Sequence, residues 1–116
     1  MSKHLLIGQQ GETLAEIWLK NKDYNIIEKN WRSGRNEVDL IATKNKCLHF
    51  IEVKTRTGFQ VATPEQKVKG GKMKNLKEAA MKYLEKYPQW QMIQFDVLSI
   101  VLYNGKEFYY FIEDAF

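Results

Sequence analysis

The stretch from Glu37 to Lys54 constrains the fold of this chain more than any other part of the sequence. It consists of two runs rich in β-branched and aliphatic residues, separated by a short polar break that contains asparagine. Two such runs around a short break are typical of a β-hairpin. We therefore expect two antiparallel strands joined by a turn whose central residues are Asn45 and Lys46.

This turn fixes which residues of the two strands face each other. The register places Asp39 opposite Glu52 and Glu37 opposite Lys54. Because side chains alternate between the faces of a strand, these four charged groups are expected to share one face and one end of the sheet. A single Glu–Lys cross-strand pair contributes at most about 1 kcal/mol, so a solvated strand end is the alternative interpretation.

Apolar residues on both faces of the hairpin favour burial over solvation. They are Val38, Leu40, Ile51 and Val53 on the face away from the charges, and Ile41, Leu48 and Phe50 on the same face. Two covered carboxylates repel each other, so one takes up a proton unless a cation lies between them. Mg²⁺ is held by one or two carboxylates with water and phosphate oxygens, so the hairpin favours a metal site at Asp39 and Glu52.

The length and charge of the chain limit which class of protein it can be. Its 116 residues suffice for one hydrophobic core, so we expect one domain spanning residues 1–116. Lys and Arg number 18 against 14 Asp and Glu, which gives a formal net charge of +4. Such a moderately basic surface favours polyanionic partners without proving one.

The cysteine content and the N-terminal residues indicate where in the cell the protein is expected. Cys47, the single cysteine, cannot form an internal disulfide and lies in an apolar strand, as expected of a core residue in a reducing compartment. The apolar run Leu5-Leu6-Ile7 is far too short for a signal peptide or a membrane span. We therefore expect a cytoplasmic protein without membrane association.

Periodicity and turn residues predict the other elements. Helical spacing of apolar residues indicates helices over about residues 9–20 and 69–87, and β-rich runs indicate strands over 24–32, 91–102 and 107–112. Asn104-Gly105 is a strong signal for a hairpin between the last two strands. The order α-β-β-β-α-β-β predicts an α/β fold with a mixed sheet of about five strands flanked by helices.

One acidic residue lies in the buried stripe of the first expected helix. Glu12 lies among Gly8, Gly11 and Ala15 at helical spacing. It is either partly solvated in the first turn, where the helix macrodipole favours an acid, or turned toward a site on the sheet. The glycines let the helix backbone lie close to the sheet, which brings Glu12 nearer to whatever the sheet carries. Both interpretations stay open on the residues alone.

Basic residues gather near the charged end of the hairpin and at the start of the second long helix. They are Arg32 and Arg35 before the hairpin, Arg56 in the expected loop after it, and Lys69 and Lys72 at the helix start. Guanidinium forks suit phosphate oxygens, and helix N-termini and lysines both attract phosphate. A lysine in the first turn of a helix opposes the helix dipole and costs up to about 1 kcal/mol of helix stability. An anionic ligand would explain why lysines gather there. The alternative interpretation is that their side chains are simply solvated.

Three further features receive structural interpretations. Asp96 interrupts an apolar run and is expected to cap a bulge or pair with a lysine. The aromatic run 108–111 is expected in core or edge packing rather than as a base-stacking platform, since no basic residues are interleaved. His4 and His49 have no suitably spaced partner, so no zinc site is expected.

Taken in order, the motifs are similar to a known family. Asp39 and the run Glu52-Val53-Lys54, preceded by a helix with Glu12, resemble the core motif of PD-(D/E)xK nucleases, which have the restriction-endonuclease-like fold. More closely, the whole chain resembles the YraN-like family of uncharacterised bacterial proteins, which are similar to archaeal Holliday-junction resolvases. The matching segments are Gly8 with Gly11-Glu12 and Ala15, Asn30-Trp31-Arg32, Glu37 to Ala42, Phe50 to Arg56, Lys72, and Phe95-Asp96-Val97.

The resemblance implies a Mg²⁺- or Mn²⁺-dependent endonuclease. Asp39 and Glu52 would bind the metal together with the backbone carbonyl of Val53. Glu12 would be a further ligand, directly or through water. Lys54 would orient or help deprotonate the attacking water and steady the developing charge on the phosphate.

The resemblance also implies roles for the surrounding charges. Glu37 would be either an acid that supports the metal ligands or the structural partner of Lys54. The nucleic-acid contacts would be Arg32, Arg35, Arg56, Lys69 and Lys72. The expected substrate is DNA, in particular branched or structured DNA. Because resolvase-type enzymes act as dimers, a homodimer is implied, and the apolar strand 108–112 is either its edge or part of the core.

A non-catalytic nucleic-acid-binding protein on a nuclease-like fold is the alternative function, because sites can decay on a retained fold. A scaffold partner in a DNA-repair or DNA-uptake complex is a weaker one. Retention of Asp39, Glu52 and Lys54 together argues against decay. Two positions depart from the family pattern: Asn36 replaces a usual glycine in the turn, and Gln94 replaces a usual arginine, which removes one positive charge from the expected site region.

Overall fold

The computed structural model of the chain describes residues 3–58 and 70–115, without the side chains of residues 3–7 and 70–73. Its elements are α1 (Lys3–Asn21), β1 (Asn25–Ser33), β2 (Asn36–Lys44), β3 (Cys47–Thr57), α2 (Gly70–Lys86), β4 (Met92–Tyr103) and β5 (Lys106–Ile112). This sequence of elements confirms the predicted order α-β-β-β-α-β-β. The described residues include no helix that is both long and apolar enough to cross a membrane.

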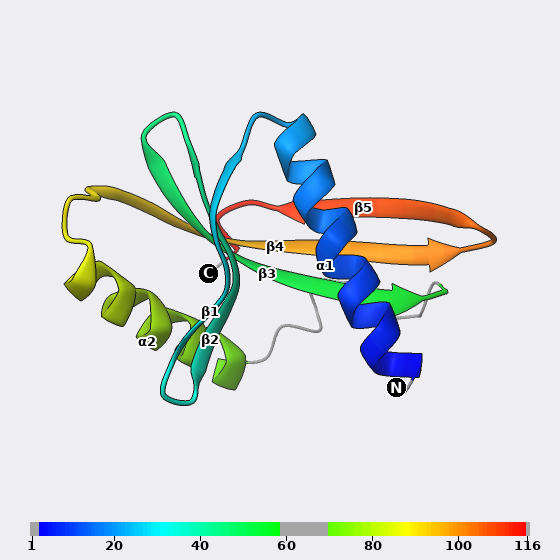
Figure 1. Ribbon diagram of the computed structural model, residues 1–116, viewed down its shortest axis with the longest axis horizontal. Helices are drawn as coiled ribbons and strands as arrows, with labels where there is room; N and C mark the ends of the chain where they lie inside the picture. The colour runs from blue at the N-terminus through cyan, green and yellow to red at the C-terminus, as the bar shows by residue number, and fades with distance from the viewer. Residues whose placement is uncertain (1–2, 59–69, 116) are drawn as a thin grey trace.

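The strands form one mixed sheet in the spatial order β1-β2-β3-β4-β5. Neighbouring strands are antiparallel, except that β3 and β4 are parallel. A parallel pair needs a crossover connection, and α2 lies in the segment between these two strands. The two helices pack on opposite faces, α1 across β3–β5 and α2 beside the β1–β2 hairpin (Figure 1). The predicted α/β fold with a five-stranded mixed sheet flanked by helices is confirmed.

Both predicted hairpin turns are present. Asn45 and Lys46 join β2 to β3 with φ angles of 51° and 65°, and Asn104 and Gly105 join β4 to β5 with 51° and 71°. Two successive residues with positive φ define the type I′ turn, whose twist matches that of paired strands. Asparagine and glycine tolerate this conformation, which explains why these turns were visible in the sequence.

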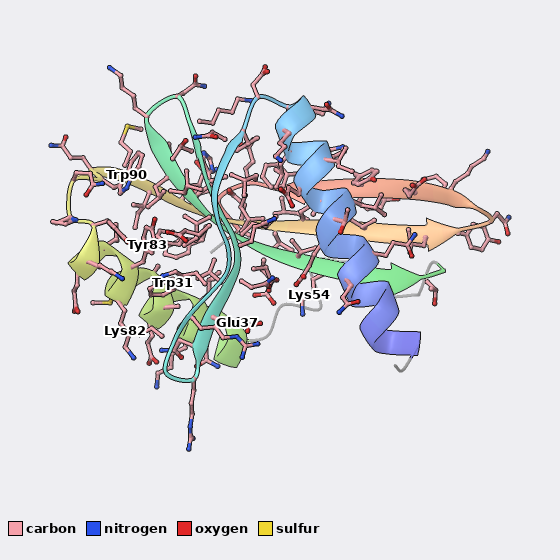
Figure 2. The ribbon with its side chains drawn as sticks, in the orientation of Figure 1. Trp31, Glu37, Lys54, Lys82, Tyr83 and Trp90 are labelled. Carbon is pink, nitrogen blue, oxygen red and sulfur yellow. The ribbon has the colours of Figure 1, made fainter. Side chains whose placement is uncertain are left out.

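Two apolar clusters cover the two faces of the sheet. Under α1 lie fully buried side chains, among them Ala15, Leu19, Leu40, Ala42, Ile51, Leu98 and Ile100. Under α2 lie Val38, Ile41, Leu48 and Phe50 with the helix residues Leu76, Ala79, Ala80 and Tyr83. Figure 2 shows Trp31 and Tyr83 in this second layer, where their rings meet edge to face at 5.2 Å. The covered faces confirm the expectation that the hairpin is buried on both sides.

Helix α1 starts earlier than expected, at Lys3 rather than near residue 9. Glycine costs about 1 kcal/mol inside a helix, which makes a start after Gly8 the natural sequence-based choice. Packing overrides this cost at Gly11, since a Cβ added there would overlap the side chain of Thr55 on β3. The missing side chain of Gly11 therefore lets α1 lie directly against the sheet.

Two details of the hairpin differ from the prediction. Val38 packs under α2 with Ile41, although strand alternation placed it on the same face as Leu40. The change of face falls where the β2–β3 ladder has ended, between Leu40 and Val38. On β1, the residue between their partners Lys29 and Trp31 is Asn30, whose φ of 51° departs from extended backbone. The other difference is that β3 continues to Thr57, so residues 55–57 are strand and not loop.

The aromatic strand β5 forms one edge of the sheet. Trp18 of α1 stacks on Tyr109 with ring centroids 5.7 Å apart and meets Phe111 edge to face at 5.5 Å. Tyr110, on the other side of the strand, is 41% exposed. The expected core and edge packing of these aromatics is confirmed, while the homodimer stays a prediction.

Candidate metal and nucleic-acid site

The site lies where the two central strands part. The β2–β3 ladder runs from Lys44 and Cys47 to Leu40 and Ile51 and then ends. Beyond this point β1 and β2 run down and away from β3, which continues to the right (Figure 1). The predicted register is thus correct for the hairpin but does not extend to backbone pairs at Asp39 with Glu52 or at Glu37 with Lys54.

Asp39 occupies the fork between the strands. Its carboxylate Oδ2 accepts a hydrogen bond of 2.8 Å from the backbone N–H of Val53. A side chain of β2 thereby takes the place of the next ladder bond and ties the diverging strands together. This bond also fixes the orientation of the carboxylate, because a charge-assisted hydrogen bond to a backbone amide is short and directional.

A cavity of about 420 Å³ opens at this fork, and four carboxylates line it. They come from three elements: Glu12 from α1, Glu37 and Asp39 from β2, and Glu52 from β3. The other lining residues are Gly8, Arg35, Val53, Thr55, Asn75 and Leu76. We call this the acid cavity. Glu12 lies well beyond the first turn of α1 and lines this cavity.

The carboxylates interact electrostatically. Burial raises the pKa of Asp39 from 3.8 to about 6; the hydrogen bond from Val53 opposes this rise, and the negative charges of Glu52, Glu12 and Glu37 add to it. Without a cation, an ionised Asp39 therefore lies in an unfavourable environment. A divalent ion among these oxygens would reverse the effect, since an opposite charge favours the ionised carboxylate.

Lys54 and Glu52 lie on the same strand and form an ion pair at 3.8 Å between Nζ and Oε1. Their side chains are 23% and 12% exposed, so the pair is largely shielded from water. Figure 2 shows Lys54 beneath the β3 ribbon and beside α1, across the fork from Glu37 on the β1–β2 hairpin. An ammonium group is thus held next to one of the cavity's acids.

The two arginines of the β1–β2 turn differ in position. Arg32 is exposed and forms a 2.8 Å ion pair between its Nε and Oε2 of Glu37. Glu37 thus has an identified partner in Arg32. Arg35 lines the acid cavity and is the guanidinium best placed to meet an anion there.

The remaining predicted nucleic-acid contacts are less closely tied to the cavity. Arg56 is a half-buried residue of β3, paired in the ladder with Val101 of β4, and lies outside the cavity lining. Lys72 belongs to α2, but its side chain lies outside the described residues, and Lys69 lies outside them entirely. From the start of α2 the cavity instead receives Asn75, which sequence reasoning missed because it is one exposed polar residue in a lysine-rich turn. Thr55 was missed because the strand was expected to end before it.

Asp96 proved to be structural, with partners other than those expected. Its fully buried carboxylate bonds His49 Nδ1 at 2.7 Å and accepts hydrogen bonds from Gln94 Nε2 at 2.8 Å and the Asp114 amide at 2.9 Å. The predicted lysine partner was wrong because the actual partners come from β3, β4 and the C-terminal turn. Gln94 therefore belongs to this cluster and not to the site region.

The donor set of the acid cavity suits a hard divalent cation. Carboxylate and carbonyl oxygens are the ligands of Mg²⁺ and Mn²⁺, and Mg²⁺ commonly takes one or two carboxylates and completes its shell with water. Among the side chains that the structure describes, those of residues 8–58 and 74–115, no three acidic, histidine or cysteine groups converge tightly enough to enclose an ion by themselves. The arrangement thus fits a water-rich site on Asp39 and Glu52 better than a closed protein cage.

The fold and the cavity together define an α/β protein with a mixed five-stranded sheet and a cluster of acids where two central strands part. The chain belongs to the uncharacterised protein family UPF0102, whose family model matches residues 11–100. This membership confirms the family expected from the motifs.

Relatives in distant bacteria match nearly the whole chain. A UPF0102 protein of Chloroherpeton thalassium is 38% identical over 125 residues, covering 100% of this chain and 97% of that protein. A UPF0102 protein of Syntrophomonas wolfei is 41% identical and covers 86% of this chain and 88% of its own length. One of Lawsonia intracellularis is 43% identical over 82% of this chain and 73% of that protein.

Proposed function

We propose that this chain is a metal-dependent endonuclease that hydrolyses phosphodiester bonds in DNA, in particular branched or structured DNA. The observation that supports the proposal is the acid cavity, in which Asp39 and Glu52 flank the fork between β2 and β3 with Lys54 ion-paired beside them. Membership of the PD-(D/E)xK superfamily, which the motif implies, is part of the same proposal.

Four groups of the chain would hold Mg²⁺ or Mn²⁺. They are the carboxylates of Asp39 and Glu52, the backbone carbonyl of Val53, and Glu12 directly or through water. When bound, the ion supplies a Lewis acid and lowers the pKa of a coordinated water. The hydrogen bond from the Val53 amide holds the Asp39 carboxylate in place before the ion arrives, which reduces the reorganisation that binding requires.

Residues around the ligands would bind and orient the scissile phosphate. Arg35 at the cavity wall offers a guanidinium fork to two phosphate oxygens. Lys54 would position the attacking water and steady the charge that develops on the phosphate as one P–O bond forms and the ester P–O bond breaks. Arg32 holds Glu37 by the 2.8 Å ion pair and thereby keeps this acid in a fixed position beside the ligands.

The test is a cleavage assay on a labelled four-way junction, with flap and linear duplex DNA for comparison. The wild-type chain is expected to cut the junction in Mg²⁺ or Mn²⁺ and not after chelation. Asp39→Asn, Glu52→Gln and Lys54→Met should each lower cleavage by at least about a hundredfold, the cost typical of losing one group aimed at developing charge. Glu107→Gln removes an exposed carboxylate on β5 and is the matched control, with activity unchanged.

Two results would contradict the proposal. Equal cleavage by wild type and the Asp39→Asn variant would mean that another nuclease or another site is responsible. Tight junction binding without cleavage in either metal would favour the non-catalytic DNA-binding protein instead. A homodimer and a cytoplasmic location remain part of the proposal, to be tested by sedimentation and by fractionation of cells.

A further inference from the structure

A second hollow adjoins the acid cavity along its wall of carboxylates. It has a volume of about 230 Å³ and shares two residues, Glu12 and Asp39, with the acid cavity. Leu40 and residues of α1 and β1 complete its lining. We call it the side hollow. A ligand that places one group beside Asp39 in the acid cavity thus has space for a neighbouring group on the other side of the same acid.

The charges of the two spaces differ. The acid cavity contains Arg35, which suits an anionic group. In the side hollow, Lys29 and Glu16 neutralise each other in an ion pair of 3.6 Å. Glu12 and Asp39 are shared with the acid cavity and are ligands of the proposed cation, which would offset their charge. The other polar side chains of the side hollow are neutral, namely the amides of Gln9 and Asn30 and the hydroxyl of Thr13. A phosphate therefore fits the acid cavity, and an uncharged hydrogen-bonding group fits the side hollow.

The position of Asn30 is unusual for a strand residue. It is exposed and has a φ of 51° in the middle of β1, where the ladder passes from Lys29 opposite Leu40 to Trp31 opposite Val38. A non-glycine residue held in the left-handed region costs about 1–3 kcal/mol, and such residues cluster at ligand sites. The residue that offers an amide to the side hollow thus lies beside Asp39 in the β1–β2 register, where the β2–β3 ladder has ended.

We propose that the side hollow binds the nucleoside next to the scissile phosphate, and that this nucleoside leaves its base pair and stack to enter it. The inference rests on the proposed nuclease function. Amide side chains read base edges by paired hydrogen bonds. Pockets for larger ligands measure about 300–1,000 Å³, so the smaller side hollow suits one nucleoside and excludes a base pair. A base inside a duplex cannot present its edges there unless it leaves the stack.

The variants remove the amides without disturbing the backbone. Asn30→Gly keeps the left-handed conformation, which glycine adopts freely, and Gln9→Ala is compatible with the exposed helix surface. Asn104→Gly is the matched control, because Asn104 also has a φ of 51° but lies in the distant β4–β5 turn. Gln10→Ala controls for the helix substitution, since Gln10 is exposed and lies outside both spaces.

The measurement is fluorescence anisotropy of labelled DNA in Ca²⁺, with three substrates of one sequence. They are a continuous duplex, the duplex with one unpaired nucleotide, and the latter with an abasic site at the unpaired position. The wild type is expected to bind the unpaired nucleotide about tenfold more tightly than the other two substrates. Asn30→Gly and Gln9→Ala should each remove most of this preference, and both controls should keep it. Equal binding of the three substrates, or a preference that survives both hollow variants, would overturn the inference.

Cleavage in Mg²⁺ and Mn²⁺ separates this inference from the proposed function. If the wild type cuts continuous duplex and unpaired substrates at equal rates, the proposed nucleoside site is rejected and the proposed nuclease function is retained. If anisotropy shows a binding preference for the unpaired nucleotide that depends on Asn30, but neither metal supports cleavage, the proposed nuclease function is rejected and the nucleoside site is retained.

Discussion

Asp39→Asn is expected to stabilise the metal-free protein at neutral pH while abolishing its cation site. Asparagine has the same shape and keeps an oxygen that can accept the hydrogen bond from the Val53 amide. It lacks the negative charge, which in the metal-free protein is desolvated and surrounded by Glu52, Glu12 and Glu37. Asp39 is therefore predicted to destabilise the fold until the proposed cation binds, as is common for residues at active sites.

The magnitude follows from the raised pKa. The folded-state pKa of Asp39 is about 6 against 3.8 ordinarily, so between these values the folded protein keeps a proton that the unfolded chain has lost. Stability therefore falls as the pH rises through this window and stays low above it. A difference of about 2 pKa units corresponds to about 3 kcal/mol. The free energy of unfolding of the variant should therefore exceed that of wild type by an amount that grows from about pH 4 and reaches at most this value by about pH 8.

The assay is urea unfolding of both proteins in a chelator at several pH values. Taking the difference in free energy of unfolding cancels the titrating groups that do not interact with Asp39, which both proteins share. Glu107→Gln, with its exposed carboxylate on β5, should show a difference that hardly changes with pH. An Asp39→Asn difference that is flat from acid to neutral pH, or that favours wild type at neutral pH, would refute the reasoning.

Three further substitutions test how the fold supports the site. Gly11→Ala should lower the free energy of unfolding by roughly 1–3 kcal/mol because its Cβ would overlap Thr55, whereas Gly8→Ala has open space around it and should raise stability by about 0.5–1 kcal/mol. Urea unfolding measures both, and stabilisation by the two alanines alike would contradict the close contact of α1 with β3. Asp96→Ala breaks the buried pair with His49 and should cost about 3–5 kcal/mol in the same assay. Cation binding by calorimetry should be unchanged in that variant, and a selective loss of binding would move Asp96 into the site.

The features that the sequence predicted are those set by near neighbours. The turn at Asn45 and Lys46 could be placed because the residues that tolerate positive φ lie between two β-rich runs. From that turn the strand register followed by counting, and it is correct up to Leu40 and Ile51. The grouping of Asp39 with Glu52 was therefore predictable, because both residues lie only one step beyond the last paired residues.

The features that sequence reasoning missed depend on contacts between distant segments. Strand alternation assumes a continuous ladder, so it gave no sign that β2 would leave β3 at Asp39 and send Val38 to the other face. The partner of Asp96 is His49, 47 residues away, and no local pattern links the two. The close contact of Gly11 with Thr55 is likewise made only in the folded protein. The early start of α1 was missed because glycine propensity argues against a helix that continues through Gly8.

The central claim is that the acids at the fork between β2 and β3 hold a divalent cation. The most direct test is an anomalous difference map from crystals soaked in Mn²⁺. The account predicts a peak between the carboxylates of Asp39 and Glu52 that is absent from crystals of the Asp39→Asn variant. Well-ordered crystals with no peak there, or with Mn²⁺ bound only elsewhere on the chain, would contradict it.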